Sequence, residues 1–493
     1  MFFKFKFFIF LLLSLFIFLF FTFLLLLLIK DSNIFFFKHL ALFSSAISFL
    51  YSFKIFLTFD LTSYYFQNIF RLPIFFDFLN LQFIFGLDNI SLLFFLLSNF
   101  LIFLCLIFVY NDRFFKFYSL NLIFLQLILL LIFSILNLLL FYIFFEAVLI
   151  PMFLLIGIFG SRERKIWANY MLVFYTICGS LFMLLGIIYI YLVSGTFSIE
   201  FLLNFSFSEI EQYFLWLAFF LSFASKIPIF PLHIWLPEAH VEAPTVGSVI
   251  LAGILLKLGV YGLIRFNLSF FPIASIFFTP LIFSLGSLGI IYASFTAIRQ
   301  IDLKRIIAYS SIAHMNLVVI GIFSFNFLGF EGAMFQSISH GFVSSALFFL
   351  IGIIYSRYHT RSLYYYSGLV QVMPLYSFYF LFFTMANIAL PGTSSFIGEL
   401  LLLLGCFFSN FFITFFIVSC VVLGGSYSLW LYNKIIYGNI KSLYLISFSD
   451  INFKEFFVLI SLMLFTLFFG IFPYFLFNYL HPTSIFILLP FIF

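Results

Sequence analysis

Long apolar runs constrain the fold of this chain more than any other feature of its sequence. Windows of about 20 mostly apolar residues, the length a helix needs to cross a bilayer, recur from one end to the other. Only 8% of the 493 residues are charged and 65% are hydrophobic, whereas a soluble domain carries roughly 25% charged residues. The sequence therefore excludes an ordinary soluble globule and predicts an all-α polytopic membrane protein.

We predict about fourteen transmembrane helices. The first run is too long for a signal-peptide core and lacks a small-residue cleavage site, so we expect it to remain as a membrane helix. No soluble domain interrupts the pattern, and the longest extramembrane segment, 57–88, contains Pro73. The approximate spans are 3–28, 34–53, 88–110, 117–135, 137–159, 167–193, 213–236, 245–265, 271–298, 302–323, 327–354, 372–404, 407–433 and 455–479.

Basic residues are spread unevenly over the connections between these spans. With an even number of spans, the odd-numbered connections lie on one side; they hold fifteen of the 22 lysines and arginines, against five on the other side. The positive-inside rule then places the basic loops in the matrix or cytoplasm and both termini in the intermembrane space or periplasm. The fifteen are Lys30, Lys38, Arg113, Lys116, Arg162, Arg164, Lys165, Arg299, Lys304, Arg305, Arg357, Arg361, Lys434, Lys441 and Lys454.

Two spans contain internal prolines. Pro228 and Pro231 lie in span seven and Pro391 in span twelve, and an interior proline breaks or kinks a helix. Because the two broken spans are five apart, an odd number, we predict two inverted five-helix repeats, an arrangement common in transporters. The expected division is 1–116, a core of two repeats at 117–265 and 271–433, and a C-terminal loop and helix at 434–493.

Six titratable residues lie deep inside predicted spans, where a charge is costly and usually functional. Each residue type also has a structural alternative. The acids could make hydrogen bonds that pack helices together, the lysines could snorkel to the membrane surface, and the histidines could be hydrogen-bonded core residues. Burial favours a neutral lysine, a nearby carboxylate favours the charged form, and histidine titrates near neutrality, so such a set suits proton transfer. The six are Glu146, Lys226, Lys257, His314, His340 and Glu399, while His233 is interpreted as a loop-edge residue.

The remaining polar motifs are interpreted as structural. Glu238, His240 and Glu242 alternate in a proline-bounded segment, and we favour a solvated loop over a metal site. The charge clusters 162–165 and 302–305 are predicted to be topology anchors.

The small residues and the cysteines are interpreted as helix-packing residues that carry no chemistry of their own. Span eight has a small-residue face for close helix packing, formed by Gly247, Ser248, Ala252, Gly253 and Gly259. The sequence has no phosphate-binding loop, dinucleotide fingerprint or nucleophile elbow. The cysteines stand singly at Cys105, Cys178, Cys406 and Cys420, so we expect neither a metal centre nor a disulfide. We also expect no basic groove for nucleic acid, and we expect lipid as a contact partner.

Four stretches carry a resemblance to a known family. They are FEAVLIPMFLLIGIFGSRERK at 145–165, the segment 222–265, QIDLKRIIAYSSIAHMNLVVIGI at 300–322 and LPGTSSFIGELLLLLG at 390–405. Together they resemble the antiporter-like family of respiratory complex I, which also includes subunits of multisubunit sodium/proton antiporters. The resemblance runs from about residue 87 to about 433. At position 399 this sequence has glutamate, as the chain 4 members of the family do, whereas some sister subunits have lysine there.

The resemblance implies a fourteen-helix fold with inverted repeats and a role in proton translocation. It assigns proton transfer to Glu146, Lys226, Lys257, His314, His340 and Glu399. It further implies that NADH, flavin, iron–sulfur clusters and ubiquinone are used by other subunits, that chains 2 and 5 are partners, and that the protein lies in the mitochondrial inner membrane. A cation/proton antiporter subunit and a purely structural membrane scaffold are the alternatives, and the buried charges argue against the scaffold.

Overall fold

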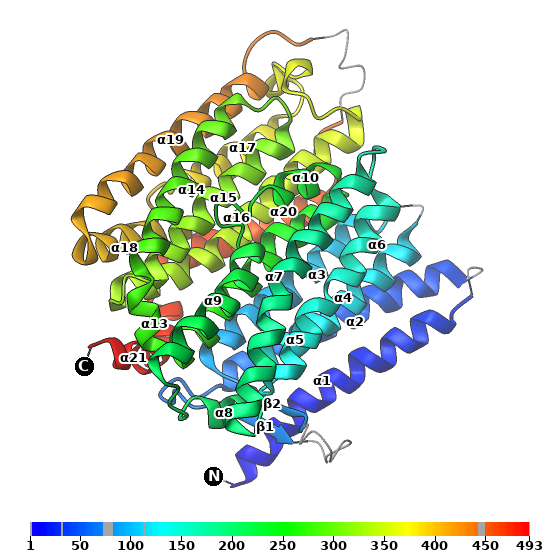
Figure 1. The fold of residues 1–493 in the computed structure, drawn as a ribbon. Coiled ribbons are helices and arrows are strands. Elements are labelled where there is room, and N and C mark those ends of the chain that lie inside the picture. The colour runs from blue at the N-terminus through cyan, green and yellow to red at the C-terminus, as the bar shows by residue number, and fades with distance from the viewer. Residues whose placement is uncertain (1, 31–32, 72–81, 113, 442–448, 493) are drawn as a thin grey trace.

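A computed structural model describes residues 2–30, 33–71, 82–112, 114–441 and 449–492 of the chain. Within these ranges the chain forms a bundle of long, roughly aligned helices, with both termini at the same end (Figure 1). Twelve described helices are long and apolar enough to cross a membrane. Two helices interrupted by breaks complete the expected fourteen, so the prediction of an all-α polytopic protein is confirmed.

The unbroken spans follow the predicted apolar windows closely, because a bilayer satisfies no backbone polar groups and favours continuous helix. They are α1 (Phe2–Leu28), α2 (Ile34–Thr58), α3 (Asn89–Val109), α4 (Phe115–Ser134), α7 (Lys165–Ser194), α14 (Thr279–Arg299), α15 (Leu303–Ile322), α16 (Phe327–Tyr358), α19 (Phe411–Ile436) and α20 (Phe453–Ile471).

Both predicted proline breaks are present. Helix α9 (Glu209–Lys226) ends at Lys226, and the chain passes Pro228 and Pro231 before α10 (Trp235–Glu242) begins. Helix α17 (Pro374–Asn387) is separated from α18 (Ser394–Ser409) by a segment that contains Pro391. The inverted relation between the two halves, and the residue limits of the repeats, stay predictions.

Two further spans are irregular in ways that the sequence analysis did not predict. Span five divides into α5 (Leu138–Ala147) and α6 (Leu149–Phe159), because Pro151 has no N–H to donate to the carbonyl one turn earlier. Span eight alternates between two helix types, as α11 (Thr245–Ile250), the π-helical η3 (Leu251–Leu255), α12 (Leu256–Gly262) and the π-helical η4 (Leu263–Leu268). Each irregularity adjoins one of the predicted proton-transfer residues.

The connections add short elements. The long segment before α3 contains an antiparallel pair, β1 (Gln67–Arg71) and β2 (Ile84–Leu87), with Phe70 opposite Phe85. Pro73 lies between them, outside the described residues. The other short elements are α8 (Ile199–Leu202), α13 (Pro272–Phe277), η5 (Leu363–Tyr365) and η6 (Leu369–Gln371).

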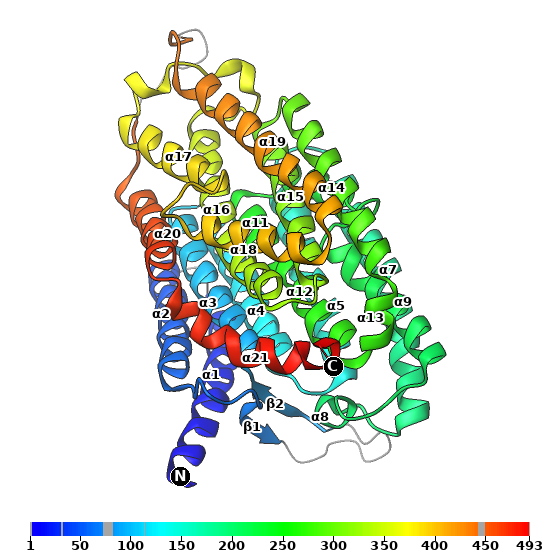
Figure 2. The same ribbon diagram turned by 90° about the vertical axis from the view of Figure 1, so that its left-hand side faces the viewer.

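The predicted last span, 455–479, is wrong at its C-terminal end. Helix α20 stops at Ile471, Pro473 follows, and a separate helix α21 (Tyr474–Ile492) crosses the other helices (Figure 2). Tyr479 donates to the carbonyl of Phe56 at 3.0 Å, and His481 lies 2.8 Å from Glu331 at the start of α16. Helix α21 therefore covers the end of the bundle at which both chain termini lie.

The basic connections share one face of the bundle, as their charge count predicts. Lys116 donates to the carbonyl of Ile29, and Lys454 donates to the side chain of Asn111. The Leu303 N–H donates to the carbonyl of Arg361, which joins two further odd-numbered connections. Arg113 lies outside the described residues. We call this end of the bundle the basic face, and the end with the termini the opposite face.

Candidate functional site

The six predicted residues come from six different helices. Glu146 lies near the end of α5, Lys226 ends α9, Lys257 lies in α12, and the rest are His314 in α15, His340 in α16 and Glu399 in α18. Five of the six side chains are buried, and Glu146 is partly buried. Buried charges of this kind need partners, so the contacts of each side chain indicate what it can do.

The proline-broken helix positions Lys226. Its ammonium donates to the carbonyl of Phe145 at 3.0 Å and lies 3.9 Å from the centroid of the Phe145 ring. Lys226 is also the last residue of α9, where the negative end of the helix dipole favours a positive charge. The break therefore supplies part of the environment that a buried ammonium requires.

Glu146 lies one residue beyond this contact. One of its carboxylate oxygens is buried without a hydrogen-bond partner, although its charge acts on Lys226. Within the described part of the chain, no ion pair within 4.0 Å joins the two side chains. The structure thus shows the two residues as separated neighbours. Ala147, the residue after Glu146, is where α5 ends, so the position of the carboxylate depends on the kink.

Lys257 is held by a bond within its own span and a bond to another helix. Its ammonium lies 2.6 Å from the carbonyl of Ala252 and 2.9 Å from Nδ1 of His340. Residue Ala252 belongs to the π-helical turn η3, and single π-helical turns often occur at functional sites. At 2.9 Å, a proton can pass directly between the lysine nitrogen and the imidazole nitrogen.

The small-residue face of span eight allows this close approach. A side chain at Gly253 would overlap Leu101, and one at Gly259 would overlap Ile227. Both glycines flank Lys257, so α3 and the segment after α9 can pack tightly against its helix. The predicted packing face is confirmed at these positions.

The row continues from His340 to Glu399. The rings of His340 and His314 have centroids 5.8 Å apart, and Nδ1 of His314 lies 3.1 Å from Oε1 of Glu399. That distance is within ion-pair range, but the ring is turned so that it makes no directed hydrogen bond. Gln336 donates to the same oxygen at 3.2 Å and orients the carboxylate. Sequence reasoning missed Gln336, which is four residues from His340 on the same helix.

The six residues therefore form two groups. One group is the neighbouring pair Glu146 and Lys226; the other is the row from Lys257 through His340 and His314 to Glu399. Among the residues that the structure describes, no hydrogen bond or ion pair joins Lys226 to Lys257. Proton movement across that gap requires an intervening water or a movement of side chains.

The interpretation of 238–242 as a solvated loop is wrong. These residues belong to helix α10, and both His240 and Glu242 are buried. Glu238 is partly exposed and pairs with Arg305 at 2.7 Å. The sequence does contain a helix signal here, since Pro237 and Glu238 lie in the first turn and His240 in the last.

His240 is an additional candidate that sequence reasoning discounted. Its ring stacks on Phe348 with centroids 4.6 Å apart, and both ring nitrogens are buried without a hydrogen-bond partner. The charges of Lys304, on the basic face, and of Lys257, in the row, both act on it. Its position is thus intermediate between the basic face and the row. His233, expected at a loop edge, lies in the break but is buried as well.

The predicted anchors at 302–305 are also more than solvated charges. Lys304 is buried and donates to the carbonyl of Ala243 at 2.7 Å. Arg361 donates to the carbonyl of Val241 and to the hydroxyl of Ser161. Both residues therefore fasten α10 to the basic face, so their roles include positioning His240.

None of these clusters resembles a metal centre. Across the residues that the structure describes, no three His, Cys, Asp or Glu side chains come close enough together to hold a metal ion.

The fold and the site together define a class of protein. A helical membrane bundle with two broken helices and a buried row of titratable side chains is the architecture of ion-translocating membrane proteins. Residues 136–424 match the family described as NADH:quinone oxidoreductase/Mrp antiporter, TM.

Individual relatives narrow the class. The chain is 52% identical over 450 residues to NADH-ubiquinone oxidoreductase chain 4 of Chondrus crispus, covering 91% of both chains. It is 48% identical over 457 residues to the chain 4 protein of Arabidopsis thaliana, covering 92% of both. The chain therefore belongs to the NADH-ubiquinone oxidoreductase chain 4 family.

Solved structures agree with this assignment. A chain of respiratory complex I from Thermus thermophilus superimposes with a TM-score of 0.88 at 30% identity, covering 98% of this chain and 99% of that one. A chain of the Mrp complex from Dietzia sp. reaches a TM-score of 0.86 at 17% identity, covering 98% of each chain. The second match shows only that the fold is shared.

Proposed function

We propose that this chain is a proton-translocating subunit in the membrane arm of respiratory complex I. The relatives over most of its length are NADH-ubiquinone oxidoreductase subunits, and those names favour this function over that of a separate sodium/proton antiporter. The observation that carries the proposal is the buried row from Lys257 to Glu399, which contains groups able to hold and release protons and lies within a bundle of membrane helices.

The contacts in the row suggest how a proton moves. A protonated Lys257 can transfer a proton to Nδ1 of a neutral His340, which leaves a neutral amine and an imidazolium. The imidazolium can pass a proton on to His314 by rotation of a ring or through a water, because the centroids are 5.8 Å apart. The carboxylate of Glu399 lies next in the row, 3.1 Å from Nδ1 of His314, and Gln336 holds that carboxylate in place.

The Glu146 and Lys226 pair serves as a gate in this proposal. When the carboxylate approaches Lys226, it favours the charged ammonium; when they separate, burial favours release of the proton. The separated arrangement seen here corresponds to the second state, with the carbonyl of Phe145 as the remaining partner of Lys226.

The electron carriers belong to other subunits in this proposal. NADH, flavin, iron–sulfur clusters and ubiquinone would be bound elsewhere in the complex, and the antiporter-like chains 2 and 5 would be neighbours in the membrane arm. We place the protein in the mitochondrial inner membrane, with the basic face toward the matrix and both termini toward the intermembrane space. The uneven distribution of lysine and arginine supports that orientation.

The decisive experiment measures protons moved per NADH oxidised by the purified complex in sealed vesicles. We expect Lys257→Met to lower this ratio while the complex still assembles, because methionine fills a similar volume but carries no proton. Lys434→Gln, an exposed change on the basic face, is the control. An assembled Lys257→Met complex with the normal ratio would contradict the role of the row. Absence of flavin and iron–sulfur subunits from the purified complex would instead favour the antiporter alternative.

A further inference from the structure

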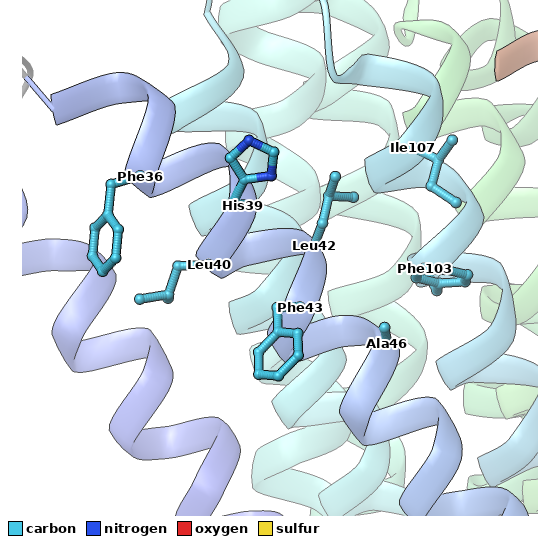
Figure 3. Close-up of a pocket in the computed structure, with 8 residues that line it drawn as sticks. All are labelled: Phe36, His39, Leu40, Leu42, Phe43, Ala46, Phe103 and Ile107. Carbon is cyan, nitrogen blue, oxygen red and sulfur yellow. The ribbon is translucent and has the colours of Figure 1, made fainter.

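An apolar furrow lies along the side of the bundle. Its upper part is a cavity of about 610 Å³ between α2 and α3 (Figure 3). His39, Leu42 and Ala46 line it from α2, and Phe103 and Ile107 line it from α3. We call the whole depression, including the lower cavity described next, the α2–α3 furrow.

A second cavity of about 520 Å³ continues the furrow. Phe49 and Phe53 follow Ala46 on the same face of α2, and Phe100 follows Phe103 on α3. Phe465 and Phe468 of α20 form the other wall. The furrow therefore lies between α2 and α20, over α3 and, in its lower part, over Ile338 and Phe342 of α16.

The two ends of the furrow differ in chemistry. At the opposite face, Phe56 packs against Phe475 and Tyr479, at centroid distances of 5.5 and 4.3 Å, and this closes the lower end. At the basic face, Lys38 and Lys454 lie over the same ring, 5.1 and 4.1 Å from the centroid of Tyr110. The end of the furrow at the basic face, which we call its mouth, therefore brings together two ammonium groups, one from α2 and one from α20.

These two lysines retain the capacity to bind an anion. Lys38 donates to the carbonyl of Tyr110 at 2.7 Å and Lys454 to Asn111 at 2.6 Å, whereas each ammonium has three donors. The two charges repel each other, and Asp112 acts on Lys38 but offsets only part of their sum. A negative group at the mouth would relieve this repulsion.

We propose that the α2–α3 furrow binds an anionic phospholipid of the leaflet on the basic face. Its phosphate contacts Lys38 and Lys454, and an acyl chain lies along the phenylalanines. From Phe36 to Ala46 the furrow extends roughly 15 Å at 1.5 Å per residue, which is about half of a ~30 Å hydrocarbon core. The upper cavity thus matches the depth of one leaflet.

A lipid suits this furrow better than a helix of another protein. An apolar helix of another protein offers no counter-charge to the two ammonium groups at the mouth, whereas the phosphate of a lipid does. The paired lysines also match a headgroup, since basic pockets on the matrix or cytoplasmic side bind anionic lipid headgroups. The proposal does not depend on proton translocation by the row.

Lipid binding to the purified, delipidated complex tests the proposal, with phosphatidylglycerol and phosphatidylcholine as probes and native mass spectrometry as the readout. We expect Lys38→Gln/Lys454→Gln to weaken binding of phosphatidylglycerol to this chain about 30-fold and to leave phosphatidylcholine unchanged. Lys434→Gln/Lys441→Gln, on the same face but away from the furrow, should change neither. Ala46→Phe, which fills the upper cavity, should weaken binding of both lipids.

Equal phosphatidylglycerol binding by the wild type and the Lys38/Lys454 variant would overturn the proposal, as would a helix of another subunit found in the furrow of the intact complex. If the variants fail to assemble, a photoreactive phosphatidylglycerol added to the wild-type complex decides the question. Crosslinks within α2, α3 and α20 support the site, and crosslinks to this chain only elsewhere reject it.

Discussion

At the scale of single residues, the contact that most affects the proposed mechanism is the one that Lys226 makes with a backbone carbonyl. Its partner at 3.0 Å is Phe145, while the neighbouring Glu146 carboxylate has an oxygen without any partner. A buried oxygen without a hydrogen bond is costly, so this arrangement is poised for a rearrangement that brings the carboxylate and the ammonium together. The kink beyond Ala147 gives the glutamate a place where the backbone can adjust.

Glu146 and Lys226 should therefore behave as one functional unit. Glu146→Gln should slow proton uptake, and Glu146→Asp, which keeps the charge with a shorter reach, should have a smaller effect. Because either change disables the same gate, the double variant Glu146→Gln/Lys226→Met should pump no more slowly than the slower single variant. Pumping rates of assembled complexes in sealed vesicles measure this. Losses that multiply in the double variant would mean that the two residues act independently.

His240 should supply protons to the row from the basic face. Its nitrogens lack protein partners and it lies near both Lys304 and Lys257, so His240→Gln, which cannot carry a proton, should reduce the pumping rate several-fold. His481→Gln, an exposed histidine on α21, is the matched control and should leave the rate unchanged. A His240→Gln complex that assembles and pumps at the wild-type rate would remove His240 from the path.

At the scale of elements, the irregular spans carry four of the six site residues, whereas His314 and His340 lie in the regular helices α15 and α16. Span eight is buried from Val246 to Leu268, and its two π-helical segments flank the short helix that contains Lys257. Span five and span seven are each broken beside a member of the gate pair. The other regular helices surround these elements. This distribution is expected where irregular backbone is tolerated only inside protein.

The end of α12 should be intolerant of added volume. A Cβ at Gly262 would overlap the ring of Phe223, so Gly262→Ala should destabilise the bundle by about 1–3 kcal/mol through overpacking. Gly424→Ala in α19 is the control, since its Cβ would meet only the hydroxyl of Tyr427 at 3.9 Å. Heating the purified complex and following loss of this chain should give a lower midpoint for Gly262→Ala alone. Equal midpoints for both variants would show that the packing at Gly262 can relax.

At the scale of the whole molecule, the charge distribution and the structure describe the same sidedness. The basic connections contact one another on one face, while the β-hairpin, α21 and both termini lie at the other (Figure 1). Ion pairs such as Arg265 with Asp88, at 2.6 Å, join elements on that opposite face. The bundle therefore has two chemically distinct ends, which a directional pump requires.

Labelling with a membrane-impermeant thiol reagent tests this sidedness. With Cys178, the exposed native cysteine, replaced by serine, Glu163→Cys should react only from the matrix or cytoplasmic side and Glu209→Cys only from the other side. Both positions are exposed at opposite ends of the bundle, Glu163 in the connection before α7 and Glu209 at the start of α9. Reaction of both from the same side would mean that the helix count between them is wrong.

The sequence alone determined the number of spans, the two proline breaks, the gathering of the basic connections at one end of the bundle and the six titratable residues within the spans. Each of these depends on local information, because a helix in a bilayer must satisfy its own backbone and a charge or proline is visible wherever it interrupts an apolar run. The same local reasoning was wrong for His240 and did not show that Lys304 is buried, because the burial of both side chains comes from helices distant in sequence. It also missed the β-hairpin and the turn between α20 and α21.

Only the tertiary structure decided which buried groups are partners. The 2.9 Å contact between Lys257 and His340 joins residues 83 positions apart, and the separation of Glu146 from Lys226 depends on a kink and a break in different helices. Helices in lipid associate through close packing and interhelical hydrogen bonds, because lipid tails are as apolar as the side chains that face them. That packing depends on side-chain shape across many helices, and a pattern of apolar residues along one helix does not contain it.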